Sequence, residues 1–287
     1  MESFIAAAVI GIVVGICSGL LGIGGGTLMV PIFRIGFSMS ALSATATSLF
    51  TIVPTSLVGC ITHFKNKTCI PVLGALCGVA GACLSPVGVY LANRSPSWLV
   101  MLVAALIIGY SSYTMFKKAL RMPKQKESAP AAGSASSSGE SSGEAGVSSA
   151  VRELPPAPSF KLVRKNVFIA LGVGMVAGLA SGYVGVGGGF IMVPLFVSLL
   201  GVDMHYASGT SLVAVTILAI PGVIEQGLLG NIWYLEGIAM AIGSIPGAVV
   251  GANLIKRVPE RTLRLLFGCF LLVAAIVLVA NEFSAVL

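Results

Sequence analysis

Long runs of apolar residues, separated by short polar stretches, make up most of the chain. Examples are the runs 101–109, 237–255 and 263–280, and the longer ones approach the ~20 residues that a helix needs to cross a bilayer core. The pattern predicts helices near 41–62, 70–92 and 97–116, and again near 204–228, 233–255 and 262–281. Such a chain is typical of an all-α polytopic membrane protein.

Each half of the chain begins with an apolar segment that a cluster of glycines interrupts. The first segment covers 4–22 and then 27–37, and the second covers 166–185 and then 190–200. Each glycine weakens a helix by about 1 kcal/mol relative to alanine. We therefore expect the helix to unwind at both clusters.

The two halves repeat one another in sequence. The stretch from Gly19 to Phe33 matches the stretch from Gly182 to Phe196, including the glycine cluster and a Met-Val-Pro triplet. The register then continues without a gap, through the pairs Thr47 and Thr210, Ser48 and Ser211, Gly88 and Gly251, Arg94 and Arg257, and Pro96 and Pro259. A match over a whole half indicates duplication, which is common among transporters.

The distribution of Lys and Arg distinguishes two topologies, because these residues gather on the cytoplasmic side of a membrane. If each broken segment crosses once, the repeats are parallel and the 17 Lys and Arg residues divide 11 to 6. If each segment turns back to its own side, the repeats are inverted and only Arg34 and Arg94 lie opposite the other fifteen. We therefore expect inverted repeats, each with a re-entrant first segment and three transmembrane helices.

A polar segment joins the halves. Its basic start is followed by a stretch rich in Ser, Ala, Gly and Glu, and then by Pro155-Pro156-Ala157-Pro158. Such a composition buries too little apolar surface to order itself. The sequence thus predicts a first transmembrane repeat at 1–116, a disordered cytoplasmic linker at 117–163 and a second repeat at 164–287, with both termini outside.

The overall composition excludes several classes of protein. Hydrophobic residues make up 56% of the chain and charged residues only 9%, so the bilayer is the expected solvent. The net charge of +7 comes from residues between apolar runs and not from a basic face, so we expect no nucleic-acid partner. The six cysteines form no CxxC pair and the histidines do not cluster, so we expect no metal or redox site. A dinucleotide cofactor would need a strand before the first glycine cluster, and an intramembrane serine protease would need a Ser–His pair, so we expect no cofactor and no catalytic residues.

The glycine clusters are the candidate binding site. In a bilayer, unwound backbone is tolerated only where it is buried in protein or lines a cavity, and exposed N–H groups at a helix start attract anions. The candidate residues are Gly24, Gly25, Gly26, Thr27, Gly187, Gly188 and Gly189. The alternative is that these glycines only let helices pack closely.

Hydroxyl groups near the start of one membrane helix in each half form a second candidate. They belong to Thr47, Ser48, Thr210 and Ser211, and could donate to a bound oxyanion without carrying a charge into the membrane. The alternative is that these hydroxyls only donate to backbone carbonyls of their own helix. Glu225 is the candidate for proton coupling if it is buried, since an intramembrane carboxylate is costly; otherwise it marks the membrane surface.

The paired Gly-x-Gly-Gly-Gly and Met-Val-Pro motifs, each followed by Thr-Ser-Leu, resemble the TauE/SafE family of sulfite exporters, also called the toluene sulfonate uptake permease family. The resemblance covers both halves. It implies an inner-membrane carrier of anions such as sulfite, thiosulfate, sulfonates or sulfoacetate, and it points to the glycines and hydroxyls named above. The competing interpretation is an anion channel with paired re-entrant loops. The expected partners are a small anion and the lipid bilayer, and a homo-oligomer is left open.

Overall fold

The computed structural model describes residues 2–121 and 164–286, and within these ranges it is helical, with no strand. The first half holds α1 (Glu2–Leu21), α2 (Gly26–Gly36), α3 (Ala41–Lys65), α4 (Pro71–Arg94) and α5 (Ser97–Arg121). The second half holds α6 (Arg164–Val184), α7 (Gly189–Leu199), α8 (Met204–Leu228), α9 (Tyr234–Leu254), the 3-10 turn η1 (Ile255–Arg257) and α10 (Glu260–Val286). The predicted helices and both interruptions are confirmed.

Eight of these helices are long and apolar enough to cross a membrane, while α2 and α7 are shorter. Many large apolar side chains on the long helices are exposed, among them Val9, Leu106 and Ile276. A water-soluble protein would bury such side chains, whereas lipid tails solvate them. The architecture is therefore that of a polytopic membrane protein.

α5 differs from its predicted range. It continues to Arg121, although the linker was predicted to begin at 117. The Lys117 ammonium lies 5.9 Å from the centre of the Tyr113 ring, so the lysine stem runs back along the helix. The rest of the predicted linker lies outside the described residues.

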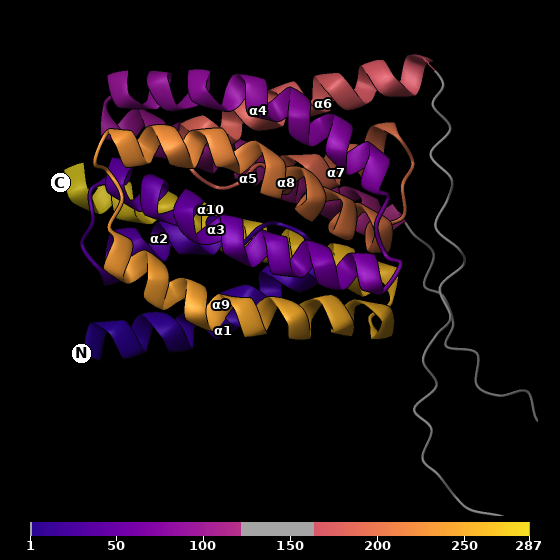
Figure 1. Ribbon diagram of the computed structural model, residues 1–287, viewed down its shortest axis with the longest axis horizontal. Coiled ribbons are helices and arrows are strands. Elements are labelled where there is room, and N and C mark those ends of the chain that lie inside the picture. The colour runs from indigo at the N-terminus through magenta and orange to yellow at the C-terminus, as the bar shows by residue number, and fades with distance from the viewer. Residues whose placement is uncertain (1, 122–163, 287) are drawn as a thin grey trace, which may run out of the picture.

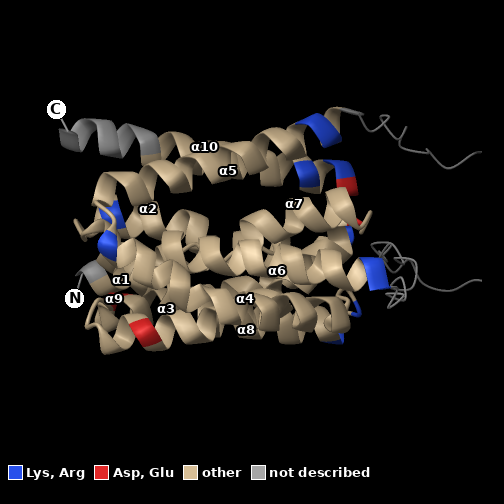
Figure 2. Ribbon diagram, turned by 90° about the horizontal axis from the view of Figure 1, so that it is seen from above, with Lys and Arg blue, Asp and Glu red and all other residues tan. Residues whose placement is uncertain are grey.

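The helices run so that both chain ends lie at one end of the molecule. α1 starts and α10 finishes there, while α5 ends and α6 begins at the opposite end (Figure 1). Lys and Arg gather mainly at that opposite end (Figure 2). α1 and α6, which open the two halves, therefore run in opposite directions.

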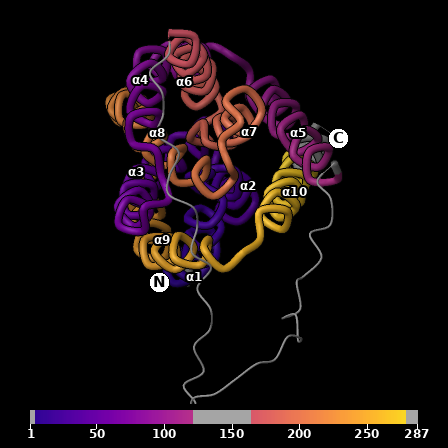
Figure 3. The backbone as a smooth tube through the Cα atoms, turned by 90° about the vertical axis from the view of Figure 1, so that its right-hand side faces the viewer, coloured from indigo at the N-terminus to yellow at the C-terminus, as the bar shows by residue number. Residues whose placement is uncertain are grey.

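The long helices form a ring in which the two halves interlock. Seen end-on, α1 lies beside α9, α4 beside α6, α3 beside α8 and α5 beside α10, while α2 and α7 lie inside the ring (Figure 3). Glycines bring two of these pairs into backbone contact: a Cβ on Gly247 would lie 2.3 Å from the carbonyl oxygen of Ile12, and one on Gly178 would lie 2.1 Å from that of Gly81. Small residues thus let helices from different halves touch along their length.

Candidate functional site

The two glycine clusters meet at the centre of the ring. A Cβ on Gly26 would lie 2.6 Å from the backbone of Val186, and one on Gly189 would lie 2.6 Å from the carbonyl oxygen of Gly22. No side chain fits into such a contact. The structure therefore brings together segments that stand far apart in the sequence, one from each half.

Backbone conformation also requires glycine in both clusters. Six of their residues have positive φ angles: Gly22 (73°), Gly24 (80°), Gly25 (86°), Gly185 (74°), Gly187 (84°) and Gly188 (70°). Residues with side chains rarely adopt this region. These turns separate α1 from α2 and α6 from α7, so the glycines have both a conformational role and the packing role weighed from the sequence.

Two apolar side chains close the space between the clusters. A Cβ on Gly24 would lie 3.0 Å from Val215 and 3.3 Å from Ile52, and one on Gly187 would meet the same two residues at 3.4 and 3.0 Å. Ile52 and Val215 occupy equivalent positions of the two halves, and both are fully buried. Side chains from both halves therefore fill the space next to the clusters.

Backbone donors at the clusters are largely unpaired. Among the described residues, the N–H groups of 23–27, 186–188 and 190 donate no hydrogen bond, whereas the N–H of Gly189 donates to the carbonyl of Gly187 at 2.9 Å. All of these residues are buried. Buried N–H groups without partners are rare and costly, so these donors are the candidate binding groups of the site.

The positive electrostatic potential at the clusters comes from helix N-termini and not from charged side chains. Within the part of the chain that the structure describes, every Lys and Arg lies near a helix end or in a connection, away from the middle of the long helices (Figure 2). The N-termini of α2 and α7 point into the centre and each carries a partial positive charge. This arrangement gives the centre a positive potential without placing a cation in the membrane.

The four predicted hydroxyls are buried and lie between the halves, where they hold the clusters in place. Ser48 donates to the carbonyl of Gly185 at 2.9 Å, and Ser211 donates to the carbonyl of Gly22 at 2.6 Å. Thr47 accepts from the N–H of Trp233 at 3.0 Å and Thr210 from that of Ile70 at 2.9 Å, so each caps a helix of the other half. Their role in anion binding stays a prediction, since Ser48 and Ser211 already use their hydroxyl hydrogens.

Three other hydroxyls at the clusters have no partner among the described residues. They belong to Ser18, Ser181 and Thr27, and all three are buried. Thr27 was among the predicted residues, but the two serines were not. The repeat could have identified them, because Ser18 and Ser181 stand four residues before the first glycine of each cluster.

Glu225 lies away from this centre. It belongs to the last turn of α8, about 15 Å along the helix axis from Val215 at a rise of 1.5 Å per residue. Its side chain is half-buried, and one carboxylate oxygen is buried without a hydrogen-bond partner among the described residues. A coupling role for Glu225 stays a prediction, and any such role would act at a distance from the clusters.

Asp203 caps the start of α8 at the opposite end of that helix. Its carboxylate accepts hydrogen bonds from the backbone N–H of His205 at 2.9 Å and from the imidazole ring at 2.7 Å. Burial by itself would raise the pKa of Asp203, but these hydrogen bonds outweigh burial and lower it. This side chain therefore fixes a helix end and lies outside the central site.

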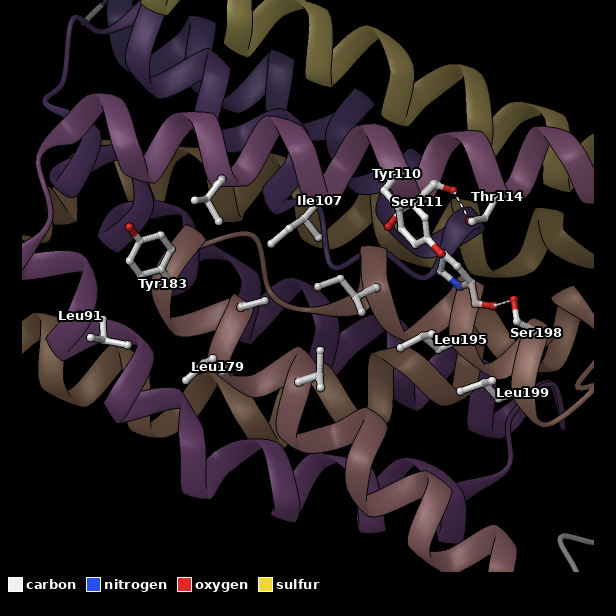
Figure 4. Close-up of a pocket in the computed structure, with 15 residues that line it drawn as sticks. Leu91, Ile107, Tyr110, Ser111, Thr114, Leu179, Tyr183, Leu195, Ser198 and Leu199 are labelled. Atoms are coloured by element: carbon white, nitrogen blue, oxygen red, sulfur yellow. Dashed lines mark hydrogen bonds between the residues drawn. The ribbon is translucent and has the colours of Figure 1, made fainter.

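A separate cavity of about 510 Å³ lies between α5, α6 and α7 (Figure 4). Apolar side chains such as Ile107, Leu179 and Leu195 line most of it. Two of its hydroxyls are already bonded to their own helices, Thr114 to the carbonyl of Ser111 at 2.8 Å and Ser198 to that of Pro194 at 2.6 Å. The cavity is suited to apolar groups and not to an anion.

Curated relatives of the chain are named as transporters. A "Probable membrane transporter protein" of Xylella fastidiosa is 28% identical over 42% of this chain and 47% of its own length, so the chain spans about half of that relative. The "Probable membrane transporter protein YunE" of Bacillus subtilis is 23% identical over 94% of this chain and 97% of its own. A "Sulfite exporter TauE/SafE family protein 3" of Arabidopsis thaliana is 37% identical over 29% of this chain and 17% of its own.

No solved structure matches the chain significantly. The sequence model of the family described as "Sulfite exporter TauE/SafE" matches residues 7–278, which covers both glycine clusters and most of every long helix. This chain belongs to the TauE/SafE sulfite exporter family.

Proposed function

We propose that the protein is a secondary transporter of a small sulfur-containing anion, of the sulfite, thiosulfate, sulfonate or sulfoacetate type, in the plasma membrane. The observation that carries the proposal is the meeting of two unwound glycine turns at the centre of the ring, with buried N–H groups that lack partners. Backbone N–H groups at helix starts bind oxyanions. The sulfur chemistry of the substrate follows from the family.

Burial of the site favours a carrier that works by alternating access. Ile52, Val215 and both clusters are buried, so protein encloses the N–H groups in the conformation seen here. Halves of related sequence that run in opposite directions can exchange conformations and expose one central site to each side in turn. The hydrogen bonds of Ser48 and Ser211 to opposite glycine turns would couple the two halves during that exchange.

The orientation in the membrane follows from charge. The end of the molecule that holds Lys65, Lys67 and the start of α6 is the cytoplasmic one, because Lys and Arg collect on that side. On a background without the six native cysteines, Lys67→Cys should resist an impermeant thiol reagent in intact cells and Ser97→Cys should react. Labelling of Lys67→Cys but not of Ser97→Cys would reverse the orientation, and equal labelling in lysed cells is the control.

Binding of the anion is tested first, on purified protein. Methanesulfonate and sulfite should raise the melting temperature in proportion to the logarithm of their concentration above Kd, whereas acetate should raise it less. Gly25→Ala is the informative variant, since its added methyl group meets side chains and no backbone: Met29 at 3.1 Å, Val14 at 3.2 Å and Ser18 at 3.5 Å. The positive φ of Gly25 costs an alanine about 1–2 kcal/mol of stability, which a folded protein can tolerate. This variant should insert and fold but lose the shift, and an unchanged shift would separate the glycine turns from binding.

Transport is tested in vesicles. Vesicles loaded with unlabelled methanesulfonate should transiently accumulate labelled methanesulfonate above equilibrium, because a carrier exchanges one substrate for another through a single site. A channel built on the same glycine turns would show steady anion current and no such accumulation. That outcome would show that the protein is a channel and not a carrier.

A further inference from the structure

We propose that the central site takes singly charged oxyanions, with the hydroxyls of Ser18 and Ser181 as donors that complete it. The inference rests on the proposed function and narrows its substrate class. Alkanesulfonates and hydrogensulfite are singly charged, whereas sulfate, thiosulfate and sulfoacetate carry two charges at neutral pH. The site then selects among sulfur oxyanions by charge.

Ser18 lies against the first glycine turn. It is 1% exposed, and its Cβ lies 3.5 Å from the point where a side chain on Gly25 would begin. Its carbonyl accepts the N–H of Gly22 at 2.8 Å, which ties the last turn of α1 to the glycine turn. Its hydroxyl has no partner among the described residues.

Ser181 repeats this arrangement in the second half. It is fully buried, and its carbonyl accepts the N–H of Gly185 at 2.8 Å. Its hydroxyl, like that of Thr27 in the first turn of α2, has no partner in the described part of the chain. A buried hydroxyl without a partner is destabilising, and its occurrence at equivalent places beside both turns points to a shared ligand.

The charge of that ligand follows from what surrounds it. The N-terminus of a helix such as α2 or α7 acts as about half a positive charge, so the two together supply about one. Among the described residues, no Lys or Arg reaches the centre to supply more. The cost of removing an ion from water rises with the square of its charge, so a dianion would cost far more and remain half compensated.

The serines are tested by binding of methanesulfonate to the purified full chain. Ser18→Ala and Ser181→Ala should each weaken binding about tenfold or more, because a hydrogen bond to a charged group is lost. The melting temperature of the free protein should stay the same or rise, because an unpaired buried hydroxyl is removed. A serine that only supports the fold would lower the melting temperature when replaced, so weaker binding with an unchanged or higher melting temperature indicates contact with the anion.

Ser85→Ala is the matched control. Ser85 is also fully buried with an unpaired hydroxyl among the described residues. Its carbonyl packs against Gly182 of α6, but its hydroxyl faces Gly222 of α8, 2.9 Å from where a Cβ there would lie, and not a glycine turn. Its substitution should leave methanesulfonate binding unchanged. An equal loss in Ser85→Ala, or no loss in Ser18→Ala and Ser181→Ala, would overturn the assignment. Should Ser18→Ala fold poorly, Ser18→Cys fills the space with a slightly larger side chain that donates only weakly, and it must show the same loss.

Charge selection is tested with wild-type protein at constant ionic strength. Methanesulfonate should bind at least tenfold more tightly than sulfate or thiosulfate. Sulfite binding should weaken as rising pH removes the proton of hydrogensulfite, while methanesulfonate binding over the same range serves as the control for the protein's own titration. Equal or tighter binding of sulfate would overturn the charge inference and leave the proposed transporter intact. Binding of none of these anions would overturn both.

Discussion

Gly22→Ala and Gly185→Ala are each expected to yield little or no stably folded protein. A Cβ on Gly22 would lie 2.3 Å from the carbonyl oxygen of Ser208, and one on Gly185 would lie 2.4 Å from Cβ of Thr45. Both positions also have positive φ angles, which cost an alanine about 1–2 kcal/mol before any clash. With overpacking of about 1–3 kcal/mol or more, the total approaches the 5–15 kcal/mol that stabilises a typical protein.

Gly109→Ala and Gly172→Ala are the matched controls for this expectation. Both glycines lie inside long helices, α5 and α6, and an added Cβ would meet nothing within 4 Å. Each change should stabilise the protein by up to about 1 kcal/mol, because alanine favours the helix. Melting curves of the four purified variants, together with their yields of monodisperse protein, decide the matter. A Gly22→Ala protein as stable as Gly109→Ala would show that the two halves do not meet as described.

The double variant Ser48→Ala and Ser211→Ala is expected to lose about 2–6 kcal/mol of stability, with or without anion. Each substitution removes the donor to a buried glycine carbonyl of the other half, and an acceptor left unpaired costs about 1–3 kcal/mol. The single variants should each show a smaller loss, since each removes only one of the two bonds. Thermal unfolding of the four proteins measures it.

Ser95→Ala serves as the reference for that comparison. Ser95 directly follows α4, and its hydroxyl donates to the carbonyl of Leu91 in the last turn of that helix, at a half-exposed position. Its loss should therefore change stability by less than about 0.5 kcal/mol. Unchanged stability in Ser48→Ala together with lost methanesulfonate binding would assign the hydroxyl to the ligand instead. The contrast with Ser18→Ala, which should lose affinity without losing stability, separates positioning serines from binding ones.

The positions of the helices and of their breaks could be predicted from the sequence, because both depend on local conformational preferences. Apolar runs of membrane length form the long helices wherever they occur, because backbone groups in lipid must bond within their own segment. The breaks between α1 and α2 and between α6 and α7 were equally predictable, since no neighbouring segment can compensate for several helix-weakening glycines in a row. The register of the repeat even marked which positions of the two halves correspond.

Only the tertiary structure shows which buried hydroxyls have hydrogen-bond partners. Thr47, Ser48, Thr210 and Ser211 stand out in the sequence, yet their bonding partners lie in the other half and depend on how α3 and α8 cross the glycine turns. Ser18 and Ser181 look like ordinary serines within apolar helices, and only the folded arrangement leaves their hydroxyls buried without partners beside those turns. Sequence determines where a helix forms or breaks because those preferences are local, whereas the pairing of a hydroxyl depends on contacts between distant segments.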